Sequence, residues 1–373
     1  MTGRTTPPFR ADHVGSLLRP ARVHQAREEL AKGVITAADL RAVEDEAIRE
    51  VVAMQRAAGL HTATDGEFRR ATWHMDFIYS LKGISKSSEK IHVTFHNAAG
   101  DLDWSPAGLK VHDKVDLDDV IFGEHFDFLK SVIGPGQIAK QTIPSPSMVY
   151  YRGGRAAVSE QVYPDLEDFH TDLAAAYAKQ IAGMAARGCT YLQLDDTSLA
   201  YLNDPEQRAL VARMGGDPDK QHIRNIRTMN AALAHRPAGL TVTTHLCRGN
   251  FRSSWVAAGG YDFVADALFN ELNVDGYFLE FDDERSGGFE PLRFVPKGKH
   301  VVLGLVTTKR GELESVDSLR HRIDAAARYV DLDQLCLSPQ CGFSSTEEGN
   351  NLTPAEQRAK LERIVETAAL VWG

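Results

Sequence analysis

Four residues in the second half of the chain carry side chains that commonly bind zinc: two cysteines, a histidine and a glutamate. His245 and Cys247 stand two positions apart in TVTTHLCRGN, and residues i and i+2 of a strand point to the same side. Glu280 and Cys341 each stand at the end of a later strand-like segment. Thiolate, imidazole and carboxylate groups are the usual zinc ligands, and a zinc site that admits a substrate thiol can make it a nucleophile. The four residues therefore predict a metal site that activates sulfur.

Each of these residues, taken alone, also has a simpler structural explanation. A histidine can be satisfied inside the core, and a cysteine can pack as a small hydrophobic side chain. These explanations do not account for four candidates that all stand at equivalent ends of strand-like segments. Glu280 is taken as the carboxylate ligand. Asp282 is its alternative, because it lies two residues further along and, by strand alternation, shares the same face.

The other two cysteines differ in their surroundings. Cys189 and Cys336 lie within apolar, strand-like segments, which predicts that they are buried core residues. Cys247 and Cys341 are followed at once by polar, glycine-containing segments, RGNF and GFSS. Four cysteines in a chain of 373 residues do not make a disulfide framework, so metal binding is the better prediction for the second pair.

Short apolar segments alternate with amphipathic helical segments along almost the whole chain. The strand candidates are residues 13–18, 61–67, 137–144, 190–196, 240–247, 276–281, 300–306 and 334–341. The clearest helical candidates, with a period of 3.6 residues, are 37–59, 167–188 and 315–330, and a last helix is expected over 354–371. Thr36 is a suitable N-cap for the first of these helices.

Eight such strand–helix units, with strands apolar on both faces, predict an α/β fold of the (β/α)8 TIM-barrel type. A doubly wound open sheet is the competing architecture. No linker, repeat or low-complexity segment divides the chain, so we expect a single domain over residues 1–373. The segment 85–118 interrupts the alternation and predicts a hairpin-like insertion. Because it follows the second strand, we expect it to cover the active-site face.

Composition excludes several classes of partner. The net charge is −9 and the basic residues form no cluster, so nucleic-acid binding is not expected. No apolar segment approaches the roughly 20 residues that span a bilayer. The first residues, MTGRTTPPFRADH, lack the apolar region of a signal peptide, so a cytoplasmic location is expected.

Polar residues collect where the other predicted strands end, on the face where barrel enzymes carry their active sites. They are His13, Gly15 and Ser16 where the first strand ends, Asp65 to Glu67 where the second ends, Asp195 and Asp196 where the fourth ends, and Thr307 to Lys309 where the seventh ends. An acidic pair such as Asp195–Asp196 can equally serve as a helix N-cap. Agreement among so many strand ends favours one shared site over a series of separate caps.

These motifs resemble the cobalamin-independent methionine synthase family, and within it the zinc-binding C-terminal catalytic barrel. The similarity rests on HVGSLLRP, TDGEFRR, QLDD, THLCRGNF and SPQCGF, and it covers essentially the whole chain. FRADHVGSLLRP and TDGEFRRATWHMDF are closer still to the short, single-barrel members of the family. The resemblance implies a zinc-dependent S-methyltransferase that moves a methyl group onto a zinc-bound thiolate, with homocysteine as acceptor and methionine as product.

Carried over residue by residue, the resemblance implies that zinc is held by His245, Cys247, Glu280 and Cys341. It implies that Glu67 and Asp195 bind the ammonium group of homocysteine and that the backbone around Gly15–Ser16 receives its carboxylate. The physical chemistry agrees, because two inward-facing carboxylates repel each other unless a cation lies between them. Backbone N–H groups at a glycine turn also bind carboxylates well. Arg19 and Arg70 are further substrate-binding candidates, with structural ion pairs as their alternative role.

The methyl donor is less defined. In the folate-using members of the family, the loop after the seventh strand carries an aspartate and a histidine linked to protonation of the donor. Here Thr307 and Lys309 stand in those places. Lys309 and His13 are therefore the candidate catalytic groups, and a solvated loop lysine is the alternative role of Lys309. A folate, a corrinoid protein and a small methyl compound such as a sulfonium are all open as donors.

Other functions use similar residues. Epoxyalkane:coenzyme M transferase resembles the same barrel and zinc site and alkylates a different thiol. That thiol carries a sulfonate and no ammonium, so paired acids such as Glu67 and Asp195 suit it poorly. A zinc-storage barrel and a metal-free, decarboxylase-like barrel are alternatives outside thiol alkylation. The paired acids favour an amino-acid thiol.

Overall fold

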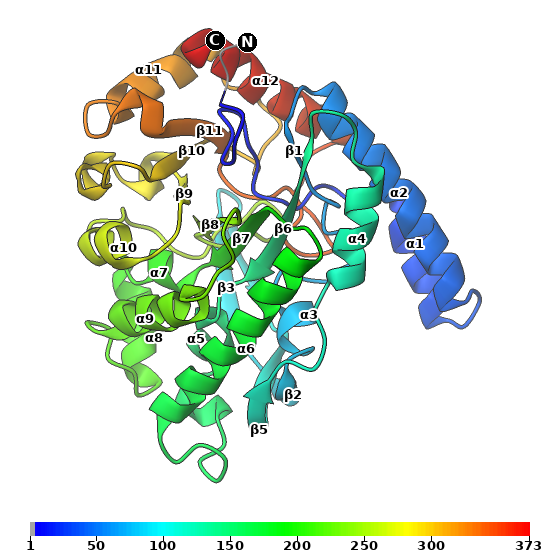
Figure 1. The fold of residues 1–373 in the computed structure, drawn as a ribbon, viewed down its shortest axis with the longest axis vertical. Coiled ribbons are helices and arrows are strands. Elements are labelled where there is room, and N and C mark those ends of the chain that lie inside the picture. The colour runs from blue at the N-terminus through cyan, green and yellow to red at the C-terminus, as the bar shows by residue number, and fades with distance from the viewer. Residues whose placement is uncertain (1–3) are drawn as a thin grey trace.

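The chain folds around one curved sheet. In the computed structural model, which describes residues 4–373, seven parallel strands are hydrogen-bonded in the order β1–β6–β7–β8–β9–β10–β11. They are β1 (Thr62–Ala63), β6 (Ile138–Pro144), β7 (Tyr191–Asp196), β8 (Thr241–Leu246), β9 (Gly276–Glu280), β10 (His300–Val306) and β11 (Leu335–Pro339). Their order follows the sequence without the reversal that a doubly wound sheet requires. The sheet curls, and helices lie around its outer side (Figure 1).

The first predicted strand, 13–18, is wrong in its extent. Within the described residues this part of the chain contributes a single parallel bridge, which pairs Ala11 with Leu337 of β11. The backbone N–H of Leu17 instead donates to Gly66 O at 3.1 Å, and Ser16 O accepts from the N–H of Phe343 at 2.9 Å. Loops after β1 and β11 therefore provide the backbone hydrogen-bond partners of this segment. The apolar residues had predicted that a neighbouring strand would provide them.

The predicted helices 37–59, 167–188, 315–330 and 354–371 are confirmed, with ends that shift by a few residues. The α-helices are α1 (Ala21–Ala31), α2 (Ala37–Ala57), α3 (Met75–Ile78), α4 (Gly123–Val132), α5 (Ser147–Tyr151), α6 (Leu166–Ala186), α7 (Ser198–Tyr201), α8 (Pro205–Arg213), α9 (Gln221–Leu233), α10 (Ala265–Glu271), α11 (Val316–Ala326) and α12 (Pro354–Trp372). Short 3₁₀ turns are η1 (Arg155–Ala157), η2 (Glu284–Ser286), η3 (Glu290–Phe294) and η4 (Leu332–Gln334). Thr36 and Asp39 form the reciprocal hydrogen bonds of a capping box at the start of α2.

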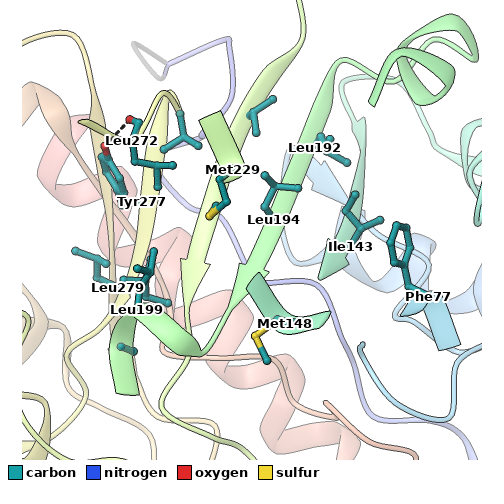
Figure 2. Close-up of a cluster of buried hydrophobic side chains, with 14 of the residues drawn as sticks. Phe77, Ile143, Met148, Leu192, Leu194, Leu199, Met229, Leu272, Tyr277 and Leu279 are labelled. Atoms are coloured by element: carbon teal, nitrogen blue, oxygen red, sulfur yellow. Dashed lines mark hydrogen bonds between the residues drawn. The ribbon is translucent and has the colours of Figure 1, made fainter. Parts of the chain in front are cut away.

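Neighbouring residues of each strand face opposite sides of the curled sheet. On β7, Leu192 and Leu194 are fully buried and belong to the large core between sheet and helices, which also contains Met229 of α9 (Figure 2). Gln193 and Asp195 take the alternate positions, and the Gln193 amide donates to the Asp195 carboxylate at 2.6 Å. The side chains that face the helices thus stabilise the sheet by burying apolar surface, and the alternate positions, on the concave side, can carry polar groups.

A small apolar cluster lies on the concave side, separate from the main core. It consists of Val14, Phe278, Val302 and Cys336. Burial raises the pKa of the Cys336 thiol to about 12, so this thiol stays protonated and inert. Cys189 is also buried, within the main core, and its pKa is likewise raised to about 12 by burial. The prediction of two structural cysteines is confirmed.

The hairpin-like insertion forms two antiparallel pairs. β2 (Lys82–Lys90) pairs with β5 (Ala107–Asp116), and β3 (Val93–Asn97) pairs with β4 (Gly100–Trp104) between them. The rings of Phe95 and Trp104 lie 5.3 and 5.4 Å from that of Phe251, measured between centroids. Because Phe251 follows β8, the β3–β4 hairpin rests on the loop at the carboxyl end of that strand.

Among the described residues, every helix is too short or too polar to cross a bilayer.

Candidate metal centre and adjoining pocket

The four predicted metal ligands lie together. His245 is on β8, Cys247 follows that strand, Glu280 ends β9, and Cys341 follows β11. Their ligand atoms all lie within 4.8 Å of one another, and all four residues are buried. We call this set the metal cluster. Asp282, the alternative carboxylate, is outside this set of converging atoms and lies 3.6 Å from Arg285 in an ion pair.

The metal cluster has the atoms and the spacing that zinc needs. The sulfurs of Cys247 and Cys341 are 3.4 Å apart. Ligands held about 2.0–2.3 Å from a tetrahedral zinc lie roughly 3.3–3.8 Å from each other, so this separation suits the ion. Neither ring nitrogen of His245, nor Oε2 of Glu280, forms a hydrogen bond within the described residues. Buried polar atoms without partners are costly, and a metal ion would satisfy all three.

Proton positions in the metal cluster are strongly coupled. The shared hydrogen bond between the sulfurs lowers the pKa of Cys341 well below its usual value and raises that of Cys247 well above it. Burial raises the pKa of Glu280. Burial also opposes protonation of His245, but attraction from Cys341 and nearby carboxyl groups raises its pKa overall. Without metal, the cluster therefore holds protons that metal binding must displace.

An open pocket of about 580 Å³, counted together with the solvent at its mouth, extends from the metal cluster. His245, Cys247 and Cys341 form part of its wall. Phe95 and Trp104 of the insertion also line it. We call it the metal pocket.

Both predicted ammonium-binding residues, Glu67 and Asp195, line the metal pocket. Burial raises the pKa of Asp195 to about 7, and the neighbouring Glu67 carboxyl adds to the shift. Burial also raises the pKa of Glu67. Oε1 of Glu67 accepts a hydrogen bond from Thr142 at 2.7 Å, whereas Oε2 has no partner among the described residues. The metal pocket is thus lined both by residues of the metal cluster and by two buried acids with raised pKa values.

The two residues of the acidic pair Asp195–Asp196 make different contacts. Oδ1 of Asp196 accepts from the Ser198 hydroxyl and from the backbone N–H of Leu199, both at 2.8 Å, at the start of α7. The capping alternative therefore applies to Asp196. Asp195, on the opposite face of the strand, is the residue that reaches the metal pocket.

Ser16 lines the metal pocket, and Gly15, which precedes it, lies close to Thr142 and Glu67. Gly15 has φ +152°, and a Cβ there would lie 2.7 Å from Thr142 Cγ2 and 3.1 Å from Glu67 Oε1. Gly342, which follows Cys341, would place a Cβ 1.9 Å from Ser16 Oγ. Glycine at both positions lets the turn approach the metal ligands and the acid closely.

Replacing Gly15 with alanine should destabilise the protein by about 2 kcal/mol, because the new methyl group overlaps Thr142 in a backbone region that L-residues rarely adopt. The matched control is Gly100→Ala. Gly100 also has a positive φ, +127°, but a Cβ there meets nothing within 4 Å. The control should cost about 1 kcal/mol from backbone strain alone. Urea unfolding measures both, and equal losses would contradict the steric role of Gly15.

The two predicted substrate-binding arginines have internal partners. One guanidinium nitrogen of Arg19 donates to Ser344 and Thr346, and the other donates to the carbonyls of Glu67 and Arg70. Arg70 donates to Thr142 and lies 3.6 Å from the Glu67 carboxylate. Both side chains are buried and outside the lining of the metal pocket. These contacts correspond to the structural alternative, and a direct substrate contact by either arginine stays a prediction.

The two candidate catalytic groups also lie outside the lining of the metal pocket. His13 is buried, and burial followed by the charge of Lys140 lowers its pKa to about 4. Lys309 lines a different cavity, and its buried Nζ has no hydrogen-bond partner among the described residues. Its positive charge opposes the rise in the pKa of Glu280. Lys309 is therefore close enough to influence the cluster electrostatically, and its catalytic role stays a prediction.

Several pocket residues were not predicted from the sequence. Trp73 and His74 stack on each other, with centroids 4.4 Å apart, and both line the metal pocket. Arg152, Tyr201 and Asn250 complete much of the remaining wall. These residues come from turns and very short helices, which carry no periodic signal. The segment TWHMDF was noted as a motif, but nothing in it distinguished pocket residues from core residues.

A curved parallel sheet with a His–Cys–Glu–Cys cluster at its carboxyl edge is an α/β domain with a candidate metal site. The chain belongs to the family of the cobalamin-independent synthase catalytic domain, whose model matches residues 154–369. The family suggested by the sequence motifs is therefore confirmed.

Three relatives illustrate the similarity. The chain is 47% identical to the Bacillus subtilis protein named "Uncharacterized protein YxjG", over 99% of this chain and 96% of that one. It is 38% identical to a crystal structure from Listeria monocytogenes, named as a candidate vitamin-B12 independent methionine synthase, with a TM-score of 0.78 over 98% of each chain. It is 25% identical to the methionine synthase of Pyrococcus abyssi, over 94% of this chain and 91% of that protein.

Proposed function

We propose that the protein is a zinc-dependent thiol S-methyltransferase that converts homocysteine to methionine. The observation that carries the proposal is the metal cluster, three of whose residues, His245, Cys247 and Cys341, line the same pocket as two buried acids. The named relatives in Pyrococcus abyssi and Listeria monocytogenes support methionine as the product. We further propose that the fold is a single (β/α)8 barrel over residues 1–373, with the segment at Ala11 as its eighth strand and 85–118 over the active-site face.

In the proposed reaction, His245, Cys247, Glu280 and Cys341 hold zinc. Bound there, zinc would lower the pKa of an incoming thiol, so that a thiolate forms at neutral pH. Glu67 and Asp195 bind the ammonium group, and ammonium binding keeps Asp195 ionised at a pH near its raised pKa of about 7. The backbone around Gly15–Ser16 receives the carboxylate.

The chain's own cysteines do not act as nucleophiles in this proposal. Cys247 and Cys341 remain ligands, and the substrate sulfur takes the methyl group in an in-line displacement as the bond between the methyl carbon and the donor breaks. The pocket contributes by holding donor and sulfur in reacting positions. Paired acids at the substrate end favour an amino-acid thiol over a sulfonate-bearing thiol, which they would repel.

Purified protein loaded with zinc should retain one tightly bound zinc per chain after dialysis, and Cys341→Ala should lose it. The loaded protein should form methionine from homocysteine with at least one donor from a panel of mono- and polyglutamyl methylfolate, methylcobalamin and S-methylmethionine. Mass spectrometry of the product measures the outcome. A protein that binds zinc yet forms methionine with none of these donors would contradict the proposed activity and favour a storage role.

A further inference from the structure

The segment that takes the place of the first predicted strand is held by side chains from three parts of the sheet. Three successive carbonyl groups of this segment each accept a hydrogen bond from one of them. The pairs are His13 O with Lys140 Nζ at 2.6 Å, Val14 O with Gln193 Nε2 at 2.7 Å, and Gly15 O with the Thr64 hydroxyl at 2.6 Å. Lys140 lies on β6, Gln193 lies on β7, and Thr64 directly follows β1. Side chains thus fix the path of this segment, where backbone N–H groups would fix a regular strand.

Gln193 also contacts an acid of the metal pocket. Its Nε2 donates to Val14 O at 2.7 Å and to Oδ1 of Asp195 at 2.6 Å. A carbonyl oxygen accepts hydrogen bonds and cannot donate them, so the nitrogen of the amide, and not its oxygen, faces Val14. The side chain is fully buried. One amide group therefore joins the amino-terminal segment to Asp195.

Two other fully buried glutamines make a different set of contacts. Gln180 donates to Ile121 O at 2.8 Å and accepts from the N–H of the same residue at 2.9 Å. Gln55 donates to Thr64 O and accepts from the N–H of Thr64, both at 2.9 Å. Each of these amides pairs its nitrogen and its oxygen, whereas Oε1 of Gln193 has no partner among the described residues. A buried oxygen without a partner costs stability, so the two bonds from the nitrogen of Gln193 point to a role other than stability.

The two partners of Gln193 lie at the two ends of the proposed amino-acid site. Val14 and Asp195 both line the metal pocket, and Gln193 stands outside that lining. Val14 directly precedes the Gly15–Ser16 turn, which receives the substrate carboxylate in the proposed reaction. Asp195 binds the ammonium group in the same reaction. The two hydrogen bonds of Gln193 therefore connect the carboxylate end of the site to its ammonium end.

We propose that Gln193 is a positioning residue that holds the carboxylate end and the ammonium end of the amino-acid site at a fixed distance. It thereby selects ligands that carry both charged groups on one carbon atom. This role rests on the proposed function, which assigns the two ends. Two groups on one carbon have a fixed separation, and a site already set to that separation binds both without rearrangement. Gln193 acts through Val14 and Asp195 and not by contact with the substrate.

Calorimetric titration of the full chain, with no methyl donor present, tests this role. The ligands are methionine, methylthiobutanoate, which lacks the ammonium group, and methylthiopropylamine, which lacks the carboxylate. Gln193→Met removes both hydrogen bonds and keeps the length of the side chain. It should weaken methionine binding about tenfold. The affinity for each truncated ligand should change by about twofold at most, because a ligand that uses one end does not depend on the spacing of the two.

Gln180→Met is the matched control. It removes two hydrogen bonds of another fully buried glutamine, which lies on α6 and outside the lining of the metal pocket. It should bind all three ligands as the natural chain does.

Gln193→Glu is a second variant, which serves if Gln193→Met does not fold. It keeps the shape of the side chain, but a carboxyl group carries at most one proton and cannot donate to Val14 and Asp195 together. It should show the same selective loss of methionine binding.

The proposed role of Gln193 is overturned if the folded variants bind methionine as tightly as the control does. It is also overturned if they weaken the binding of all three ligands by the same factor, as a general structural defect would. Because the titration needs no methyl transfer, either result leaves the proposed reaction standing. A natural chain that does not bind methionine would instead overturn the amino-acid site itself, and the role of Gln193 with it.

Discussion

Replacing Cys247 with serine is expected to abolish tight zinc binding and methyl transfer together. The sulfur of Cys247 lies 3.4 Å from that of Cys341, and a serine hydroxyl stays protonated at neutral pH and binds zinc poorly. We expect zinc affinity to fall by at least about 100-fold. Turnover should fall by at least about 1,000-fold, because a metal supplies several kcal/mol of transition-state stabilisation. Zinc content after dialysis and methionine formation measure the two effects.

Cys336→Ala is the matched control for this substitution. Cys336 is also a buried thiol, on β11, but it belongs to the apolar cluster with Val14, Phe278 and Val302. The control should keep one zinc per chain and most of its activity, at a modest cost in stability. Full zinc binding and turnover in Cys247→Ser would remove Cys247 from the ligand set and with it the proposed mechanism.

Replacing Glu67 with glutamine should raise the KM for homocysteine by about 10–100-fold, the range expected when a charge-assisted hydrogen bond is lost. The substitution keeps the shape of the side chain and its contact with Thr142, which lies 2.7 Å from Oε1. It removes the negative charge that faces the metal pocket. Mercaptobutyrate, which is homocysteine without its amino group, should show little change in KM, because it offers no ammonium.

The difference between the two thiols is the informative result. A structural defect would impair both thiols alike, whereas loss of an ammonium site impairs only homocysteine. Glu44→Gln serves as the control, because Glu44 is a buried carboxylate that pairs with Arg27 and Arg69 away from the metal pocket. If Glu67→Gln raised both KM values equally, the acids would not form an ammonium site.

The metal cluster was predictable because its geometry follows from strand periodicity. His245 and Cys247 are two residues apart, so they share a face, and the carboxyl ends of neighbouring parallel strands meet at one edge. The same alternation explains why Asp195 faces the metal pocket while Asp196 bonds to the start of α7 on the opposite face. The sequence analysis took the two acids together, and only the family resemblance singled out Asp195.

Predictions failed where the backbone leaves regular structure. The apolar residues of 13–18 suggested a strand, but Gly15 has φ +152° and the flanking groups bond to loops after β1 and β11. Arg152 and Trp73 reach the metal pocket from turns, whose geometry depends on tertiary packing and not on spacing. For Arg19 and Arg70 the sequence offered both a substrate contact and a structural role, because it does not show which backbone carbonyls accept hydrogen bonds from each guanidinium group. Their contact with substrate stays a prediction.

The pairing of Ala11 with Leu337 has a consequence for how the protein is made. A chain that emerges from the ribosome presents the first of these residues long before the second, so its amino-terminal segment has no partner during most of synthesis. The last metal ligand, Cys341, emerges at nearly the same moment as Leu337. Pairing of the amino-terminal segment with β11 and completion of the metal cluster thus depend on the same late stretch of chain. A product that stops before β11 would lack both, and its open strand edges would mark it for chaperones and proteases.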